Sequence, residues 1–350
     1  MRHSIQHFPI TMILPKISIV VPSYNQGQYL EETLLSIINQ QYPNLELLVA
    51  DGGSNDNSID IIKKYEQHIT WWVSEKDRGQ SDAINKGLQR ATGEIVNWLC
   101  SDDLYTEKSL FIVANHFLQL PEGVGLVHGD TTLFRDKTII RDDGGYKDPS
   151  LERNLAGMAF PQPSAFFLKK YLDLIGPLVN ETLHYGMDYD LYSRLACVCG
   201  FIQVDEILSA YRLHDSSKSV KEQHKFMGDW SPVFANLCRN LGWNDVLTVM
   251  QSSGFFDNRI FDFRFDFSFT PNQEIINGAD KKKILFYHYC YLLKSLYWSG
   301  EMETARKLLK YLRENYSTAW LKDEKDVPGI GRKLTLPGFV LSTLKKVKRL

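Results

Sequence analysis

Residues 17–53, ISIVVPSYNQGQYLEETLLSIINQQYPNLELLVADGG, decide the fold that we expect for this chain of 350 residues. The stretch begins with a short β-branched apolar run that Pro22 ends, and a second apolar run closes just before two glycines. Between the two runs, apolar residues recur with a helical period and share one face: Leu30, Leu34, Ile37 and Ile38. A strand, a helix and a second strand of this kind predict a parallel sheet that is covered on both faces.

The alternation of strand and helix continues for about a hundred residues, which is typical of an α/β layer with right-handed crossovers. Further helices are expected over residues 58–68 and 80–91, and further strands over residues 69–75 and 94–103. Polar residues stand where each strand ends: 23–25, 51–54, 75–77 and 101–103. Ligands of open sheets bind beyond the carboxyl ends of the strands, so we expect a site at this edge.

From Gly123 onward the alternation loosens, and we expect a mixed part of the same sheet. Strands are predicted within residues 123–130, 131–136, 138–145, 162–168 and 201–213, and a helix is predicted to begin near residue 187. The predicted fold class is therefore α/β, a mixed and mostly parallel sheet between helices, with a C-terminal helical extension.

The C-terminal third has a different pattern. Residues 281–316 have the periodicity of two amphipathic helices joined at Ser299-Gly300, a hairpin that loosely resembles one tetratricopeptide-type repeat. One copy cannot form a solenoid, so we expect this hairpin to pack on the main domain. Residues 259–269, RIFDFRFDFSF, alternate aromatic and polar side chains, which predicts a strand.

These patterns predict four parts of the chain: an N-terminal segment at 1–15, a main domain at 16–220 with halves 16–110 and 111–220, a mainly helical extension at 221–326, and a tail at 327–350. After Asp326 the tail has basic residues and no acidic ones, and its apolar residues favour an amphipathic helix. Such a helix can lie on an anionic membrane surface. A solvated tail is the equally open alternative.

Composition limits the classes of function. The formal net charge of −2 gives no sign of a nucleic-acid-binding protein. The five cysteines include no CxxC pair, which favours reduced thiols and a cytosolic setting. No apolar stretch approaches the ~20 residues that a membrane span needs. The N-terminal residues lack the long apolar core of a signal peptide. We therefore expect a cytoplasmic protein.

Asp102 and Asp103 stand side by side where the predicted strand of residues 94–103 ends. Two adjacent like charges each make ionisation of the other more costly. A divalent cation would reverse that cost and use both carboxylates. The alternative is a solvated turn or the start of a helix, because Thr106 and Glu107 follow.

An ordered series of motifs resolves what one pair of aspartates leaves open. The segments VVPSYNQ (20–26), ADGGSNDNS (50–58), SEKDRGQSDAINKG (74–87), TGEIVNWLCSDDLY (92–105), MDYDLYSRLA (187–196) and YRLHDSSKS (211–219) together resemble the family 2 glycosyltransferases, which have the GT-A fold. The resemblance covers about residues 16–220. Any one of these motifs alone would be weak, whereas their order is specific.

The resemblance implies a nucleotide-sugar site and a metal site. The residues that it assigns to the nucleotide-sugar are Pro22, Ser23, Tyr24, Asn25, Asp51, Gly52, Gly53, Asp77 and Asp102. It assigns Asp103 and His214 to a Mn²⁺ or Mg²⁺ ion, which oxygen ligands and a neutral imidazole suit. Arg78 and Lys86 are candidate phosphate contacts. The alternatives are a simple turn for Asp51, a surface position for His214 and a solvated position for Lys86.

The resemblance also implies an acceptor site in the second half of the domain. Asp188 matches the aspartate that serves as general base, and Gln162, Ser164 and Asp190 are expected on the acceptor side. Met187 stands where the family has a glutamate, which removes one acidic neighbour of Asp188. Both aspartates also suit a helix N-terminus, where the helix dipole stabilises a negative charge. His184 and Tyr185 are weaker candidates for the acceptor side, and ordinary packing is the role that we expect for both.

The function implied by the resemblance is an inverting, metal-dependent transfer of a sugar from a nucleotide-diphospho-sugar, with UDP favoured. The acceptor would be a glycan or a lipid-linked molecule in cell-surface polysaccharide synthesis, at the inner face of the membrane if the tail binds it. The alternative is a module that binds a nucleotide-sugar or glycan without turnover and recruits partners through its C-terminal helices. A dinucleotide-dependent oxidoreductase is disfavoured, because no GxGxxG opens the first helix.

Overall fold

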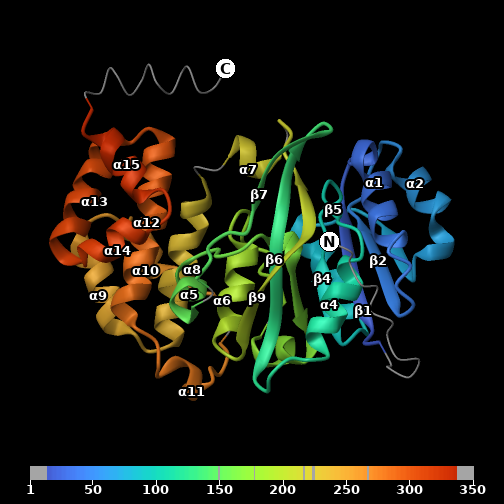
Figure 1. The fold of residues 1–350 in the computed structure, drawn as a ribbon, viewed down its shortest axis with the longest axis horizontal. Helices are drawn as coiled ribbons and strands as arrows, with labels where there is room; N and C mark the ends of the chain where they lie inside the picture. The colour runs from blue at the N-terminus through green and yellow to red at the C-terminus, as the bar shows by residue number, and fades with distance from the viewer. Residues whose placement is uncertain are drawn as a thin grey trace, which may run out of the picture.

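The computed structural model describes residues 14–148, 150–176, 178–215, 217–222, 225–265 and 268–336. A nine-stranded sheet runs through the centre of the molecule, with the C-terminal helices gathered at one end and helices α1 and α2 at the other (Figure 1). The strand order is β3-β2-β1-β4-β8-β6-β9-β5, and β7 pairs with β6. The predicted α/β class, with a mixed sheet between helices and a C-terminal helical extension, is confirmed.

The first half of the sheet is parallel, as the alternation of strands and helices predicts. Strand β1 pairs with β2 on one side and with β4 on the other, and β2 pairs with β3. The strands are β1 (Ile17–Ser23), β2 (Leu45–Asp51), β3 (Trp71–Ser74) and β4 (Ile95–Trp98). The connecting helices are α1 (Gly27–Ile38), α2 (Ser58–Lys64) with the 3-10 turn η1 (Glu66–His68), and α3 (Gln80–Arg90).

The second half is mixed. Strand β8 runs antiparallel between β4 and β6, whereas β6 and β9 are parallel neighbours. Its strands are β5 (Leu104–Tyr105), β6 (Val124–Arg135), β7 (Thr138–Asp143), β8 (Ala165–Leu168) and β9 (Gly200–Arg212). Its helices are α4 (Ser109–Phe117), α5 (Leu151–Ala156), η2 (Gln162–Ser164), η3 (Lys169–Leu174), α6 (Met187–Ala196) and α7 (Lys218–Lys221). The strands predicted at 123–130 and 131–136 are one continuous strand, β6.

Alternate residues of β1 are buried on the two faces of the sheet. Ile19 packs in the same cluster as Leu34 of α1, whereas Val20 packs with Ile84 of α3. Gly87 lets α3 approach the sheet closely, because a Cβ there would lie 2.3 Å from Cγ1 of Val20. Burial on both faces explains why the strand sequences are continuously apolar rather than alternating.

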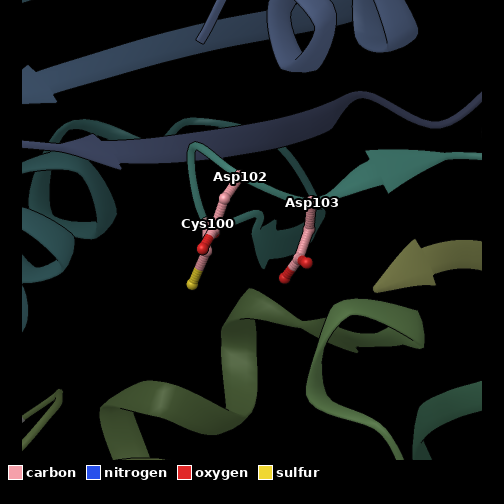
Figure 2. A group of neighbouring side chains, drawn as sticks. All are labelled: Cys100, Asp102 and Asp103. Atoms are coloured by element: carbon pink, nitrogen blue, oxygen red, sulfur yellow. The ribbon is translucent and has the colours of Figure 1, made fainter. Parts of the chain in front are cut away.

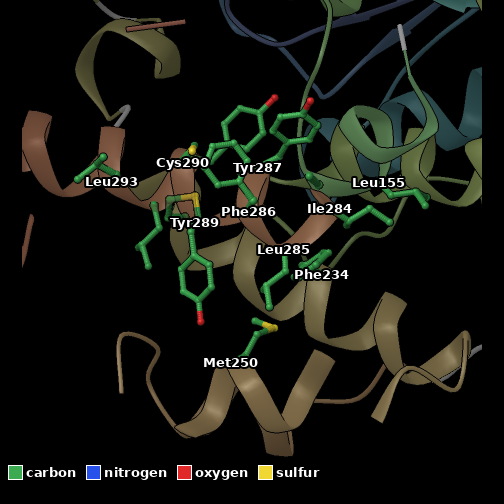
Figure 3. Close-up of a cluster of buried hydrophobic side chains, with 14 of the residues drawn as sticks. Leu155, Phe234, Met250, Ile284, Leu285, Phe286, Tyr287, Tyr289, Cys290 and Leu293 are labelled. Atoms are coloured by element: carbon green, nitrogen blue, oxygen red, sulfur yellow. The ribbon is translucent and has the colours of Figure 1, made fainter. Parts of the chain in front are cut away.

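The C-terminal helices form a layer of their own that packs against α5 and α6. They are α8 (Phe226–Asn240), α9 (Asn244–Ser253), α10 (Arg259–Asp262), α11 (Gln273–Ile276), α12 (Lys281–Ser299), α13 (Met302–Asn315), α14 (Thr318–Asp323) and α15 (Val327–Leu334). Figure 3 shows Leu155 of α5, Phe234 of α8 and Met250 of α9 in one buried cluster with Ile284 and Leu285 of α12. The predicted hairpin is thus α12–α13, packed on the main domain. None of the described helices combines the length and apolar character that crossing a membrane requires.

The strand predicted at 259–269 is wrong for the residues that the structure describes there. Residues 259–262 form α10, and 263–265 have no regular structure. Two arginines satisfy the carbonyl groups that a neighbouring strand would otherwise bind. Arg239 donates to the carbonyl oxygens of Phe261 (3.0 Å) and Phe263 (3.4 Å), and Arg264 also donates to Phe261 (2.6 Å). Phe261 and Phe265 pack in the hydrophobic cluster of the C-terminal helices instead, whereas Phe263 is 37% exposed.

A buried ion-pair network ties the C-terminal helices to the main domain. Glu324, only 2% exposed, lies 2.7 Å from Nη1 of Arg153 in α5 and 3.0 Å from Nζ of Lys294 in α12. The guanidinium of Arg153 lies between the rings of Tyr146 and Tyr287, at 4.0 and 3.5 Å from their centroids. One carboxylate therefore neutralises two cations that have little access to water.

We expect Glu324→Gln to destabilise the protein by about 3–5 kcal/mol, because removal of one partner leaves buried charges uncompensated. The matched control is Glu303→Gln, which breaks an exposed pair with Lys307 (3.1 Å) and should cost about 0–1 kcal/mol. Urea unfolding of the two variants beside the wild type measures the difference. Equal losses of unfolding free energy in the two variants would show that the buried network stabilises the protein no more than an exposed ion pair does.

Candidate active site

Two adjoining cavities lie where the strands of the first half end. Cavity A, of about 530 Å³, is bounded by the ends of β1 and β2, the start of α3 and residues 100–103. Cavity B, of about 380 Å³, lies beside it, toward α6 and α8. The two cavities share five lining residues: Gln80, Cys100, Asp103, Tyr211 and Lys218. A molecule in one cavity would therefore meet a molecule in the other at Asp103.

The two aspartates lie at this junction, as their place in the sequence predicts. In Figure 2 the side chains of Asp102 and Asp103 point to the same side as the sulfur of Cys100. One ligand atom from each of the three residues lies within 4.8 Å of the others. Asp103 is 2% exposed, and its Oδ1 accepts a hydrogen bond from the Arg212 N–H at 3.0 Å. This arrangement is a possible acidic metal site.

Burial raises the pKa of Asp103 well above its usual value, and the charge of Asp102 adds to that rise. Burial, with both carboxylates nearby, also raises the pKa of the Cys100 thiol. The sulfur therefore stays protonated and is a poor ligand, whereas the carboxylate oxygens suit a hard divalent cation. The residues present fit such an ion, because its charge would offset the repulsion that the two carboxylates exert on each other.

His214 lies beside Asp102 rather than Asp103. Its Nε2 is 2.9 Å from Oδ2 of Asp102, and its ring lies 4.8 Å from that of Tyr29. His214 lines cavity A together with both aspartates. The tertiary structure thus brings the histidine of residues 211–219 to the acidic pair from more than a hundred residues away in the sequence.

The end of β1 lines cavity A through Pro22, Ser23 and Tyr24. The Tyr24 ring is 59% exposed, so its face is available to a planar ligand. Asn25 has another role: its Oδ1 accepts from the Asn55 N–H (2.9 Å), and its own N–H donates to Ser54 (2.8 Å). Asn25 therefore shapes the loop, and it is not among the residues that line the cavity.

Asp51 occupies the turn after β2. The side chain is 2% exposed, and Oδ2 accepts from the N–H groups of Gly53 (3.1 Å) and Ser54 (2.9 Å) and from the Ser74 hydroxyl (2.7 Å). This geometry agrees with the alternative that Asp51 simply shapes a turn. Gly53 has a φ of +80°, which glycine adopts without strain.

Asp77 approaches the same turn from the end of β3. A Cβ on Gly52 would lie 2.6 Å from Oδ2 of Asp77, so only glycine permits the two segments to come this close. Both Gly52 and Asp77 line cavity A. The predicted phosphate contacts Arg78 and Lys86 are instead paired with acidic residues, Arg78 with Glu181 (2.8 Å) and Lys86 with Glu75 (2.9 Å).

Two other lysines, Lys76 and Lys218, line cavity A, and the sequence analysis did not single them out. Lys218 also lines cavity B, and its Nζ donates to the carbonyl oxygen of His184 at 3.2 Å. Lys218 lies in the YRLHDSSKS segment, so its place in that motif is the feature of the sequence that could have identified it. Lys218 gives the junction positive charge and Lys76 adds positive charge to cavity A, whereas Arg78 and Lys86 line neither cavity.

Asp188 lines cavity B at the start of α6, where the resemblance places the general base. The side chain is half-buried, and Oδ1 accepts from the Tyr189 N–H at 2.8 Å. Burial raises the pKa of Asp188 to about 6, although this hydrogen bond and the charge of Lys218 oppose the rise. Next to it, Met187 also lines cavity B, and its sulfur accepts from the Ser81 hydroxyl (2.9 Å).

The structure does not bring Asp190 and Ser164 to cavity B, in contrast to our expectation for the acceptor side. Asp190 is 3% exposed and pairs with Arg194 at 2.7 Å, one turn along the same helix. Ser164 is fully buried and donates to the Asp130 carbonyl oxygen (2.8 Å). Both side chains point into the protein, and other residues of the same two segments face the cavity. Gln162 does line cavity B.

Four further residues of cavity B were not predicted to be functional. His184 and Tyr185 precede α6, and Phe226 and Trp230 come from α8 in the C-terminal extension. Packing was the expected role of the first two, with the acceptor side as the weaker alternative, and no role was expected for the others. Aromatic residues in an amphipathic helix are usually core residues, so the sequence held no signal for Phe226 and Trp230.

Comparison with known proteins agrees with this geometry. Residues 18–173 match the model of "Glycosyl transferase family 2". An uncharacterized glycosyltransferase of Rickettsia typhi is 25% identical over 317 residues, which cover 86% of this chain and 97% of that protein. The structure of TarS 1-349 from Staphylococcus aureus in complex with UDP-GlcNAc is 17% identical, with a TM-score of 0.55 and 85% of both chains covered. The mannosyltransferase PcManGT from Pyrobaculum calidifontis, in complex with GDP-Man and Mn²⁺, is 18% identical, with a TM-score of 0.54. The match covers 96% of this chain and 88% of that chain.

The family match spans the ends of β1, β2, β3 and β4, which carry cavity A, and the two solved structures share the fold of the whole molecule. Residues 18–173 therefore form a glycosyl transferase family 2 domain, and the chain has the GT-A fold.

Proposed function

We propose that the protein transfers a sugar, with inversion, from a nucleotide-diphospho-sugar in cavity A to an acceptor hydroxyl in cavity B. The observation that carries this proposal is the junction of the two cavities at Asp103, with Asp188 lining only the second. UDP is the nucleotide that we favour, and TarS, which binds UDP-GlcNAc, supports that choice. The acceptor is a glycan or a lipid-linked molecule of a cell-surface polysaccharide.

Cavity A holds the nucleotide in this proposal. The exposed side chain of Tyr24 is suited to stacking with the base, and Gly52 lets the Asp77 carboxylate approach the turn, where both residues line the cavity and can meet the ribose. Lys76 and Lys218 supply positive charge for the diphosphate. Asp51 contributes by holding the turn of Gly52 and Gly53, because its carboxylate is already occupied by that turn.

Asp103 and Asp102 would hold the divalent cation, with His214 beside them. A bound Mn²⁺ or Mg²⁺ would neutralise charge on the diphosphate leaving group. PcManGT in complex with GDP-Man and Mn²⁺ supports the choice of metal. The Arg212 N–H holds Oδ1 of Asp103, which leaves the other oxygen of that carboxylate for a ligand.

Asp188 acts as the general base. Its carboxylate takes the proton of the acceptor hydroxyl while the acceptor oxygen forms a bond to the anomeric carbon of the sugar. The bond from that carbon to the diphosphate oxygen breaks, and the nucleoside diphosphate leaves with the bonding electron pair. A carboxylate with a pKa near 6 is mostly ionised at neutral pH and still accepts a proton readily.

Release of UDP from UDP-sugars in the presence of an acceptor-lipid extract tests this function against the alternative of a non-catalytic binding module. Turnover supports the enzyme, and binding without any release supports the module. The predicted membrane-binding tail lies mostly in residues 337–350, outside the described residues, so it stays a prediction.

Asp103→Asn should remove the Mn²⁺-dependent part of UDP affinity while the fold persists. The amide oxygen can still accept from the Arg212 N–H, and the variant loses a buried charge, so its melting temperature should be equal or higher. Calorimetric titration of UDP with and without Mn²⁺ measures the effect. The control is Asp60→Asn on the exposed face of α2, which should leave UDP affinity unchanged. If Asp103→Asn also leaves the Mn²⁺-dependent affinity for UDP unchanged, the acidic pair has a structural role and binds no metal.

Asp188→Asn should lower the single-turnover rate by about 10²–10⁴, the usual contribution of a positioned general base. Donor affinity should stay within a few-fold, because Asp188 lines only cavity B. Asp190→Asn is the comparison: it breaks the pair with Arg194 and should lower stability, while the folded fraction keeps its turnover. An inactive Asp190→Asn beside a normal Asp188→Asn would show that the wrong carboxylate was chosen.

The pH profile follows from the raised pKa of Asp188. The base must be ionised, so the rate should be flat above pH 6 and fall about tenfold per unit below it. Lys218→Gln removes a charge that holds this pKa down, so the acid limb should move to higher pH. A wild-type limb near pH 4 would mean that burial does not control this carboxylate.

A further inference from the structure

Helix α8 forms one wall of cavity B, although it lies outside residues 18–173. Phe226 and Trp230, one turn apart on α8, both line the cavity. Their rings lie 6.1 Å apart in an edge-to-face arrangement, and Trp230 also contacts the ring of Tyr189 at 5.5 Å. Nε1 of Trp230 donates to the Tyr185 carbonyl oxygen at 3.3 Å, which sets the orientation of the indole.

Asp229, between these two aromatic residues, binds the segment that leads to the proposed base. Its Oδ2 accepts from three successive backbone N–H groups, those of His184 (2.8 Å), Tyr185 (2.7 Å) and Gly186 (3.2 Å). Gly186 is the N-cap of α6, and this helix has no side-chain cap of its own. Asp229 thus supplies from α8 the acceptor that the start of α6 lacks, where a negative charge is favourable.

The contact between the two segments is tight. A Cβ on Gly186 would lie 2.8 Å from Cβ of Asp229 and 3.3 Å from Cδ1 of Trp230. Tyr185 adds a second contact with α8, because its ring lies 5.5 Å from that of Phe226, and its hydroxyl also donates to Glu222 at the end of α7 (2.6 Å). The position of Asp188, two residues beyond Gly186, therefore depends on α8.

The chemistry of cavity B points to the kind of molecule that it takes. Aromatic faces from Phe160, Tyr185, Phe226 and Trp230 surround it, and polar side chains such as Gln80, Gln162 and Asp143 stand among them. A sugar ring has an apolar C–H face and a rim of hydroxyl groups, and it matches such a mixed lining. A sugar hydroxyl can form further hydrogen bonds with those polar groups, whereas an acyl chain has no polar atom to offer them.

We propose that α8 is part of the acceptor site: Trp230 and Phe226 pack against a sugar ring of the acceptor, and Asp229 is a positioning residue for Asp188. The inference rests on the proposed function and deepens it, because it assigns the acceptor a carbohydrate end. It also makes the C-terminal extension part of the enzyme's specificity.

The first experiment measures UDP release by the full-length protein from UDP-glucose, UDP-galactose and UDP-GlcNAc, with p-nitrophenyl glycosides of glucose, galactose, mannose and GlcNAc as acceptors. At least one glycoside should accelerate release. Trp230→Ala should then raise the KM for that glycoside at least about tenfold, and Trp230→Phe should restore most of the loss. Trp298→Ala, which removes an exposed tryptophan of α12, is the matched control and should behave as wild type.

The second experiment tests positioning. Asp229→Asn keeps the shape of the side chain but weakens its hold on three N–H groups, so kcat should fall at least about tenfold while the donor KM stays within about twofold. Asp229→Glu keeps the charge and should recover part of kcat, which also covers the case that the asparagine variant folds poorly. Asp245→Asn, in an exposed pair with Lys281 (3.3 Å) on the same extension, is the control and should match wild type.

The outcomes distinguish a failure of the proposed function from a failure of the acceptor-site inference alone. If no UDP-sugar is bound or cleaved under any condition, the proposed function fails and this inference fails with it. If the wild type cleaves a donor but no glycoside accelerates release, the carbohydrate assignment is overturned while the proposed function stands. If Trp230→Ala keeps the wild-type KM and Asp229→Asn keeps the wild-type kcat, α8 has no part in the acceptor site.

Discussion

Arg212, at the end of β9, makes the contacts on which the site depends. Its backbone N–H holds Oδ1 of Asp103 at 3.0 Å, and its Nε donates to the carbonyl oxygen of Asp102 at 2.9 Å. The guanidinium also pairs with Glu32 of α1 and lies over the rings of Tyr29 and Phe134. One side chain, 7% exposed, thereby joins the second half of the sheet to the acidic pair that the first half carries.

This connection explains how two adjacent carboxylates are tolerated in a buried place. Like charges with little water around them disfavour ionisation, and the raised pKa of Asp103 records that cost. Arg212, at the end of β9, offsets part of this cost through its N–H bond to Asp103 and its positive charge. A divalent cation can supply the positive charge that the two carboxylates still need.

The C-terminal helices do more than extend the chain. They share a hydrophobic core with α5 and α6, and the network of Arg153, Lys294 and Glu324 ties them to the main domain. Through Asp229 and Trp230 they also reach the segment that carries Asp188. The same packing that stabilises the extension therefore sets the geometry of cavity B, so the two properties are coupled in this fold.

Local patterns in the sequence were enough to determine the parallel half of the sheet, the helices between its strands and the polar edge where the strands end. Asp102, Asp103, Tyr24 and Asp77 could be found there, because the carboxyl ends of neighbouring parallel strands must meet at one edge. The motif series also identified His214 and Asp188, which lie far along the chain from that edge.

Only the tertiary structure decided which of two neighbouring polar residues faces a cavity. Asp188 faces cavity B while Asp190 pairs with Arg194 inside the protein, and Gln162 faces it while Ser164 is buried. The motifs distinguish Asp188 as the base but predict all four residues on the acceptor side, and a helix start favours both aspartates equally. Phe226, Asp229 and Trp230 were also out of reach, since their role follows from the place where α8 packs and not from any local pattern. Periodicity along the chain reports which face of an element is buried, whereas the partner against which that face packs is set by contacts between distant segments.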